Sequence, residues 1–141
     1  DDDTIKLWNL SNRSLVATLS SHTGSIHSLS TYKNDGKVFL VSGSHDETIR
    51  IWDIENNAAL ITTLESHTFN VTSIKTYMFD GIPYLLSGDW EGIIKIWNLS
   101  THKMMRTLDS NYGDIISSAV ANQNNKIIIA CGYVDGTVKI C

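Results

Sequence analysis

Short runs of alternating apolar and polar residues fill the chain, and turn residues separate them. In the segment Thr48 to Asp53, the apolar side chains of Ile49 and Ile51 alternate with polar ones, which is typical of a half-buried β-strand. Three further runs in the same unit have strand character: Ser25 to Tyr32, Lys37 to Ser42 and Ala59 to Leu64. No segment of useful length has the 3.6-residue period of a helix, so the pattern predicts an all-β protein.

Turn residues join these runs at regular places. Asp35-Gly36 lies between the first two runs and is a strong hairpin signal, because glycine accepts a positive φ without a Cβ clash. The same pair recurs 45 residues later as Asp80-Gly81, and Asn124-Asn125 stands at the corresponding place after that. The strands therefore belong to units of nearly constant length.

A seven-residue phrase, Asp-x-Thr-Ile-Lys/Arg-Ile/Leu-Trp, marks each unit and changes gradually along the chain. It covers residues 2–8, 46–52, 91–97 and 135–141. Its final residues, Trp8, Trp52, Trp97 and Cys141, are 44, 45 and 44 positions apart. His22 precedes Trp52 by 30 residues, and His67 precedes Trp97 by the same 30. A period in the low forties predicts a repeat architecture.

Composition narrows the function classes. With 42% hydrophobic and 18% charged residues in 141, the chain can form a core, and its net charge of −4 is modest. No Lys/Arg cluster supports nucleic-acid binding, and no apolar run approaches the ~20 residues of a membrane helix. Cys131 and Cys141 form no framework and fit a reducing compartment, so we expect an intracellular protein, cytoplasmic or nuclear.

These marks resemble the WD40 repeat family, whose repeats run from a Gly-His-like to a Trp-Asp-like dipeptide. Here the first dipeptide is Ser21-His22 or Ser66-His67, and the second is Trp52-Asp53, with Trp8-Asn9 and Trp97-Asn98 as variants. The resemblance covers the whole chain and implies a β-propeller with blades of four antiparallel strands. It divides one repeat region, residues 1–141, into a partial blade (4–19), two full blades (22–64 and 67–108) and a further partial blade (111–141).

About three blades make an open arc and cannot close a ring, so we expect the remaining blades of the propeller to lie outside this chain. The start at Asp1 also suggests that the natural beginning is missing. Self-association of the chain into a larger ring is the lesser alternative, because the third-type strands at the two ends would duplicate rather than complement each other.

The resemblance also implies a hydrogen-bonded network inside each blade, from the Trp indole through Ser and His to Asp. A buried indole N–H and a buried imidazole both need partners. The expected members are His22, Ser42, Asp46 and Trp52 in the first full blade, and His67, Ser87, Glu91 and Trp97 in the second. The third blade offers Asn111, Cys131, Asp135 and Cys141. Three of these four residues differ from the pattern, so we expect this blade to be the least rigid.

Two kinds of chemistry are disfavoured. A Ser-His-Asp set could serve a hydrolase, but a set that recurs in register with a Trp is better explained as structural. The other histidines, His27, His45 and His102, show no spacing typical of a metal site, and no Gly-x-Gly-x-x-Gly phosphate loop occurs. We therefore expect no catalytic residues, no metal and no cofactor.

The family's narrow top face commonly binds peptides or protein loops, and the resemblance places two kinds of residue there. The first precedes the acid that opens the phrase, and the second lies at the start of each first strand. The first set is His45, Trp90 and Val134, and the second is Ser25, His27, Asn70, Thr72, Asp114 and Ile116. Trp90 is the leading candidate because it lies outside the regular Trp series, in a turn, and aromatic residues supply binding hot spots.

The predicted function is a non-enzymatic scaffold that binds a protein or peptide partner on this face. The alternative is a substrate-recognition module of a larger enzyme complex, such as a ubiquitin ligase. An intrinsic hydrolase ranks last. Arginine is scarce, which disfavours a phosphopeptide receptor, because such receptors usually converge several Arg side chains on the phosphate.

Overall fold

The computed structural model describes residues 2–140, and its secondary structure is entirely β. The strands are β1 (Thr4–Asn9), β2 (Ser14–Ser20), β3 (Ile26–Asn34), β4 (Lys37–Ser44), β5 (Thr48–Asp53), β6 (Ala59–Glu65), β7 (Val71–Phe79), β8 (Ile82–Asp89), β9 (Ile93–Asn98), β10 (Lys103–Asp109), β11 (Ile115–Gln123), β12 (Lys126–Tyr133) and β13 (Val138–Ile140). The all-β prediction is confirmed.

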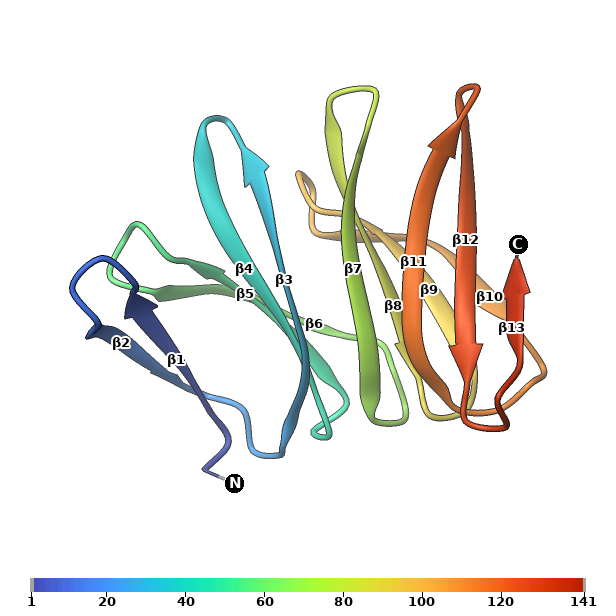
Figure 1. Ribbon diagram of the computed structural model, residues 1–141, viewed down its shortest axis with the longest axis horizontal. Coiled ribbons are helices and arrows are strands. Elements are labelled where there is room, and N and C mark those ends of the chain that lie inside the picture. Colours follow the sequence, from blue (N-terminus) through green and yellow to red (C-terminus); the bar gives the residue numbers. More distant parts are fainter. Residues whose placement is uncertain (1, 141) are drawn as a thin grey trace.

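The strands of the described chain form four separate sheets, and within each sheet the strands adjacent in sequence pair antiparallel. Their orders are β1-β2, β3-β4-β5-β6, β7-β8-β9-β10 and β11-β12-β13. The sheets stand side by side in an open arc, in which β3, β7 and β11 are neighbours (Figure 1). This arrangement confirms the expected partial propeller of four-stranded antiparallel blades.

The hairpins at one end of the sheets form where the sequence predicts them. Asp35 and Gly36 have φ angles of 50° and 80°, and Asp80 and Gly81 have 48° and 76°. Positive φ at both central residues matches the right-handed twist of the flanking strands. We call this end of the sheets, opposite the β4–β5 and β8–β9 turns, the hairpin end.

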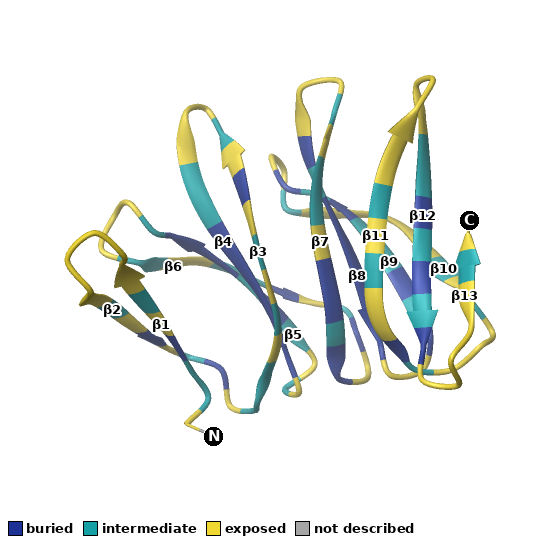
Figure 2. Cartoon of the chain, in the orientation of Figure 1, coloured by how far each residue is buried: buried dark blue, intermediate teal, exposed yellow. Residues whose placement is uncertain are grey.

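Burial is concentrated in the middle strands of the sheets. Figure 2 shows dark blue along β4, β5 and β8, and yellow at the hairpin tips. Val41 and Ile51 of one sheet pack in the same cluster as Val71 and Leu85 of the next, all without exposed surface. The core therefore lies between neighbouring sheets as well as within them.

Small residues let the first strand of each sheet lie close against its neighbour. Ser30 Oγ and Thr76 Oγ1 are 2.8 Å apart across β3 and β7, and Ser28 Oγ accepts the backbone N–H of Ile74 at 3.1 Å. Gly43 in β4 faces Val71 of β7 with no room for a Cβ atom. The Ser-Gly dipeptides of the sequence thus have a packing role as well as a hydrogen-bonding one.

Candidate functional site

The recurring phrase begins with a side-chain cap on a turn. Asp46 Oδ1 accepts hydrogen bonds from both the backbone N–H and the hydroxyl of Thr48, at 3.1 and 2.7 Å. Asp135 binds Thr137 in the same way at 2.8 and 2.7 Å. These bonds also lower the pKa of the Asp135 carboxyl, and the hydroxyl of Thr137 contributes most. A short acidic residue two positions before Thr therefore fixes the turn that enters the phrase strand.

The first full network forms with the expected residues. The indole N–H of Trp52 donates to Ser42 Oγ at 3.0 Å, and Ser42 Oγ lies 2.7 Å from His22 Nε2. His22 Nδ1 lies 2.8 Å from Asp46 Oδ2. Since Ser42 Oγ accepts from the indole, its own hydrogen goes to His22 Nε2, and His22 donates from Nδ1 to the carboxylate. With His22 as a neutral imidazole, each polar group of the network has a hydrogen-bond partner.

The pKa shifts agree with this assignment. Burial lowers the pKa of His22 and outweighs the raising effect of the Asp46 carboxylate. For Asp46, burial alone would raise the pKa, but hydrogen bonds from Thr48, Thr23 and His22 together hold it at about 2. The pair is therefore a neutral imidazole donating to a carboxylate, and the network carries a fixed direction of hydrogen bonding.

In the second full network the prediction for Glu91 is wrong. His67 Nδ1 lies 2.7 Å from Asp89 Oδ2, while Ser87 Oγ joins His67 Nε2 at 2.7 Å and Trp97 Nε1 at 2.9 Å. Glu91 is exposed and contributes its backbone N–H to Asp89 Oδ1 at 3.1 Å.

The acid that binds the histidine lies two residues earlier in the second unit than in the first, and the side-chain bonds of the turn differ accordingly. Asp89 occupies the position of Ser44 in the preceding unit. In the first unit Thr48 donates both its hydroxyl and its backbone N–H to Asp46. The residue that corresponds to Thr48 in the second unit is Ile93, which has no hydroxyl and donates only its backbone N–H, at 2.9 Å to Asp89 Oδ1. One buried carboxylate therefore binds both the turn and His67. An Asp before Trp90 in place of Ser was the sequence signal for this arrangement.

The third set does not assemble in the same way within the described chain. Asn111 is exposed, and its backbone N–H donates to Asp109 Oδ1 at 2.9 Å. The Asp135 carboxylate accepts hydrogen bonds from the backbone N–H and the hydroxyl of Thr137. Cys131 is buried, and Cys141 lies outside the described residues.

The geometry of these sets does not suit a hydrolase. Ser42 is 0% exposed, and its oxygen is engaged by both Trp52 and His22. A nucleophile must reach substrate, so a hydroxyl enclosed in this way serves the packing of the blade.

The top-face residues are held by a repeated backbone bond. The N–H groups of His45, Trp90 and Val134 donate to the carbonyls of the residues 20 positions earlier, at 2.9, 3.2 and 3.0 Å. The acceptors are Ser25, Asn70 and Asp114. Each of these turns is therefore tied to the start of its own first strand, and the side chains of the three donors are exposed.

A second repeated feature is a β-bulge at each first strand. Between β3 and β4 the pairing passes from Ile26 directly to Ser28, which leaves His27 as the extra residue. Thr72 and Ile116 are skipped in the same way in the next two sheets. Bulges re-aim side chains out of the ladder, and His27 and Ile116 are exposed.

Three of the predicted residues meet across two sheets. The ring centroids of His27 and His45 are 6.0 Å apart, and those of His45 and Trp90 are 6.2 Å apart. Trp90 remains 49% exposed in this position. We call His27, His45 and Trp90 the aromatic row. It joins the β4–β5 turn to the β8–β9 turn and presents one continuous aromatic surface.

Other predicted residues are used differently. Asn70 is only 7% exposed, so the expectation that it offers surface to a partner does not fit its burial. The Thr72 hydroxyl donates to the carbonyls of Ile115 and Gly88 and bridges two sheets. Val134 and Ile116 are exposed on the next sheet along, and Ser25 and Asp114 are half-buried.

The top-face segments are acidic. Residues 21–25, 44–47, 66–70, 89–92, 110–114 and 133–136 contain no Lys or Arg. They contain six acidic residues, namely Asp46, Glu47, Asp89, Glu91, Asp114 and Asp135. Asp46 and Asp89 bind histidines, and two basic side chains of adjoining strands contact these segments: Arg50 donates to the Ser21 hydroxyl, and the Lys139 ammonium lies over the Tyr112 ring.

The described part of the chain contains no cluster of three or more His, Cys, Asp or Glu side chains that could hold a metal ion. No helix within residues 2–140 is long and apolar enough to span a membrane.

Parts of several known proteins are similar to parts of this chain. A 43% identical match over 54 residues, 38% of this chain and 17% of the relative, is to COMPASS component SWD3 of Saccharomyces cerevisiae. Pre-mRNA-splicing factor PRP46 of Candida albicans is 41% identical over 56 residues, 40% of this chain and 14% of that protein. Human WD repeat and SOCS box-containing protein 1 is 38% identical over 53 residues, 38% of this chain and 12% of that protein.

The matched parts thus span less than a fifth of each of these relatives. The family model described as "WD domain, G-beta repeat" matches residues 13–53, 58–98 and 102–141. Each matched range begins just before the outer strand of one sheet, and the first two ranges end with the third strand of the next sheet, as residues 13–53 do with β2 and β3–β5. The chain belongs to the WD40 repeat family.

Proposed function

We propose that this chain is a non-enzymatic interaction scaffold whose top face binds a protein or peptide partner at the aromatic row. The observation that supports this proposal is the position of Trp90. Its backbone is fixed by a bond to Asn70, its ring lies against His45, and half of its surface stays open. A large aromatic side chain that is pre-positioned and still exposed can be buried by a partner at low entropic cost.

The charge around the row favours a partner segment with positive charge. Glu47 and Glu91 are exposed in the same two turns that carry His45 and Trp90, and no ion pair engages either among the described residues. A Lys or Arg side chain can pair with these carboxylates and lie over the Trp90 face. The absence of Lys and Arg from the top-face segments also disfavours a phosphopeptide there.

The experiment compares partner capture by the intact protein and its Trp90→Ala variant. Partners are recovered from cells by affinity purification and quantified by mass spectrometry. Met105→Ala is the matched control, because Met105 is a 61% exposed apolar side chain on β10, away from the top face. Loss of a defined partner with Trp90→Ala and its retention with Met105→Ala is expected. Equal recovery of every partner by both variants would remove Trp90 from the site.

A second candidate is the substrate-recognition module of a ubiquitin ligase or a comparable complex. The name of one relative combines WD repeats with a SOCS box, which favours this alternative. The other relatives reported above are a splicing factor and a COMPASS component, so we also propose an intracellular location. Co-purified ligase subunits in the same experiment distinguish this candidate from a scaffold of another kind.

A further inference from the structure

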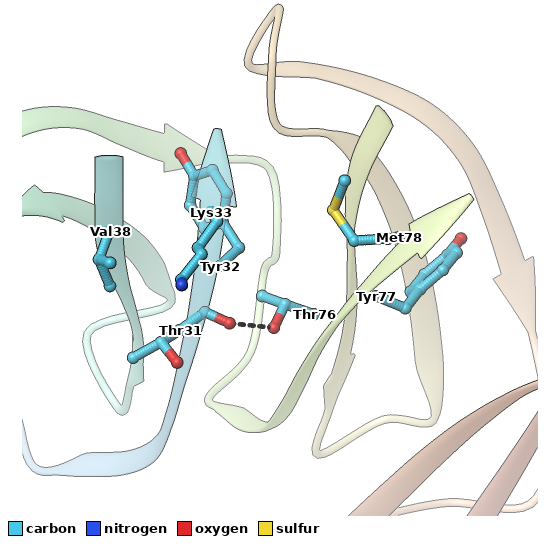
Figure 3. A pocket seen from close by; sticks show the side chains of 7 residues that line it. All are labelled: Thr31, Tyr32, Lys33, Val38, Thr76, Tyr77 and Met78. Carbon is cyan, nitrogen blue, oxygen red and sulfur yellow. Dashed lines mark hydrogen bonds between the residues drawn. The ribbon is translucent and has the colours of Figure 1, made fainter. Parts of the chain in front are cut away.

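A pocket of about 360 Å³ opens between two neighbouring sheets at the hairpin end, away from the aromatic row. Its lining residues are Thr31, Tyr32, Lys33, Val38, Thr76, Tyr77 and Met78. Figure 3 shows the residues of β3 and β4 on one side and those of β7 on the other. The Thr76 hydroxyl donates to the Thr31 carbonyl at 2.6 Å and closes the space between the strands at this point.

Two pairs of stacked rings lie in the strands beside the pocket. Tyr32 stacks on Phe39 with ring centroids 5.1 Å apart and is itself buried. Tyr77 stacks on Tyr84 at 5.5 Å. In each case the two rings belong to the paired strands of one hairpin. Figure 3 shows that the Tyr77 ring points away from β3, and it packs on the cluster beyond β7, so the wall on β7 is made by Thr76, Met78 and the backbone of Tyr77.

The rim supplies an apolar contact and one charge. Met78 is 51% exposed, and a flexible thioether side chain adapts to varied apolar partners. Lys33 is the charged member of the lining, it is exposed, and no ion pair engages it in the described chain. Because Thr31, Lys33 and Met78 are all exposed, the pocket is shallow, and this favours one anchoring side chain of a peptide over an enclosed small molecule.

We propose that this pocket is a second docking site, which takes an apolar side chain of a partner segment with an Asp or Glu beside it. The apolar anchor fills the space between β3 and β7 beside Tyr32 and covers Met78. The neighbouring carboxylate pairs with the Lys33 ammonium group. The site is independent of the aromatic row, and its expected partner charge is opposite to the one favoured on the top face.

The test starts from a displayed library of random dodecapeptides, selected on the intact protein that carries Trp90→Ala, so that the aromatic row does not contribute. The expected consensus is an apolar residue adjacent to Asp or Glu. A synthetic peptide with this consensus is then titrated by fluorescence anisotropy against the wild type, Lys33→Glu and Met78→Glu. The matched controls are Lys103→Glu and Met105→Glu, because both residues are exposed on β10.

Affinity should fall about tenfold or more with Met78→Glu and severalfold with Lys33→Glu, and both controls should bind as the wild type does. A peptide with Lys in place of the acid should regain affinity for Lys33→Glu. If Met78→Glu does not fold, the Lys33→Glu charge swap decides alone.

Three outcomes overturn the proposal. One is a consensus without acids, or no selected peptide at all. Another is equal binding by the pocket variants and the β10 controls. The third is a change in oligomeric state with Lys33→Glu by sedimentation, which would make the occupant a second copy of the chain. Each leaves the role of Trp90 untouched, because the capture experiment on the top face uses wild type as its reference.

Discussion

A glycine in the second strand of each of three sheets, which follows Ser42, Ser87 or Cys131, should affect how closely the next sheet packs. A Cβ atom on Gly43 would lie 2.7 Å from Val71 Cγ1 and 3.1 Å from Ile74 Cγ2. On Gly88 it would lie 2.9 Å from Ile115 Cγ2. The third member of the series, Gly132, has as its nearest neighbour Ser117 Cβ, at an ordinary 3.9 Å. The same substitution at equivalent positions therefore has different predicted costs.

The magnitude follows from two opposing effects. Overpacking a well-filled core costs about 1–3 kcal/mol, because the neighbouring side chains and backbone must shift. Replacing glycine by alanine inside a strand returns about 0.5–1 kcal/mol of conformational entropy. Gly43→Ala should therefore lower the free energy of unfolding by about 1–2 kcal/mol net. Gly132→Ala lacks the first effect, and its expected change is about 0.5–1 kcal/mol of stabilisation.

Urea unfolding of the intact protein, followed by tryptophan fluorescence and circular dichroism, measures the difference. The entropy effect is common to both variants, so with an m-value of about 2 kcal/mol/M the overpacking cost should lower the midpoint of Gly43→Ala by roughly 0.5–1.5 M relative to Gly132→Ala. Adding Val71→Ala should cost less in the Gly43→Ala background than in the wild type, because it removes the clashing methyl groups. Equal midpoints for Gly43→Ala and Gly132→Ala, or fully additive effects of Val71→Ala, would refute the packing argument.

Two further predictions concern the buried networks. Asp89→Asn should lower the free energy of unfolding by about 1–3 kcal/mol, because it weakens the bonds to His67 and to the turn. Glu91→Gln should change this free energy by no more than about 0.5 kcal/mol. Urea unfolding of both variants checks this, and equal effects would contradict the assignment of the acid to Asp89. Because burial lowers the pKa of His22 from 6.5, the unfolded chain binds a proton that the folded chain does not, so stability should fall as the pH drops below about 6.5. The Asp46 carboxyl, with a pKa of about 2, should add a further loss between about pH 3.8 and 2. A pH series of unfolding free energies for the wild type and His22→Gln should show a smaller slope near pH 6 in the variant, and identical slopes would count against a neutral His22.

The strands and hairpins could be predicted from the sequence because each depends on local chemistry. Alternation sets β5, and Asp35-Gly36 sets the turn between β3 and β4. The strand ends were less accurate, since β3 continues to Asn34 beyond the predicted Tyr32. Residues 33 and 34 are held by pairing with Val38 and Lys37, and such pairing appears in the sequence only through the turn that makes it possible.

The candidate site was harder to predict because its members come from different sheets. Alignment of the repeats placed His45 and Trp90 at equivalent positions, but it could not show that their rings lie 6.2 Å apart. It also gave Thr72 the same role as His27, although the Thr72 hydroxyl is committed to bonds with backbone carbonyls. Alignment of the repeats predicts the backbone position of a residue, whereas the contacts of its side chain depend on the length and chemistry of that side chain.

Asp89 shows that two repeats can keep the same hydrogen bond while the acid that makes it comes from different positions of the repeat. Its carboxylate reaches His67 from the end of β8, where Asp46 reaches His22 from the following turn. With the acid withdrawn into the strand, the turn position at Glu91 is released from the network and becomes exposed. The second sheet can therefore display a carboxylate beside Trp90 and still satisfy its buried histidine. In this way a substitution that conserves the interior changes the position of the exposed carboxylate, which is Glu91 in the second unit and Glu47 in the first.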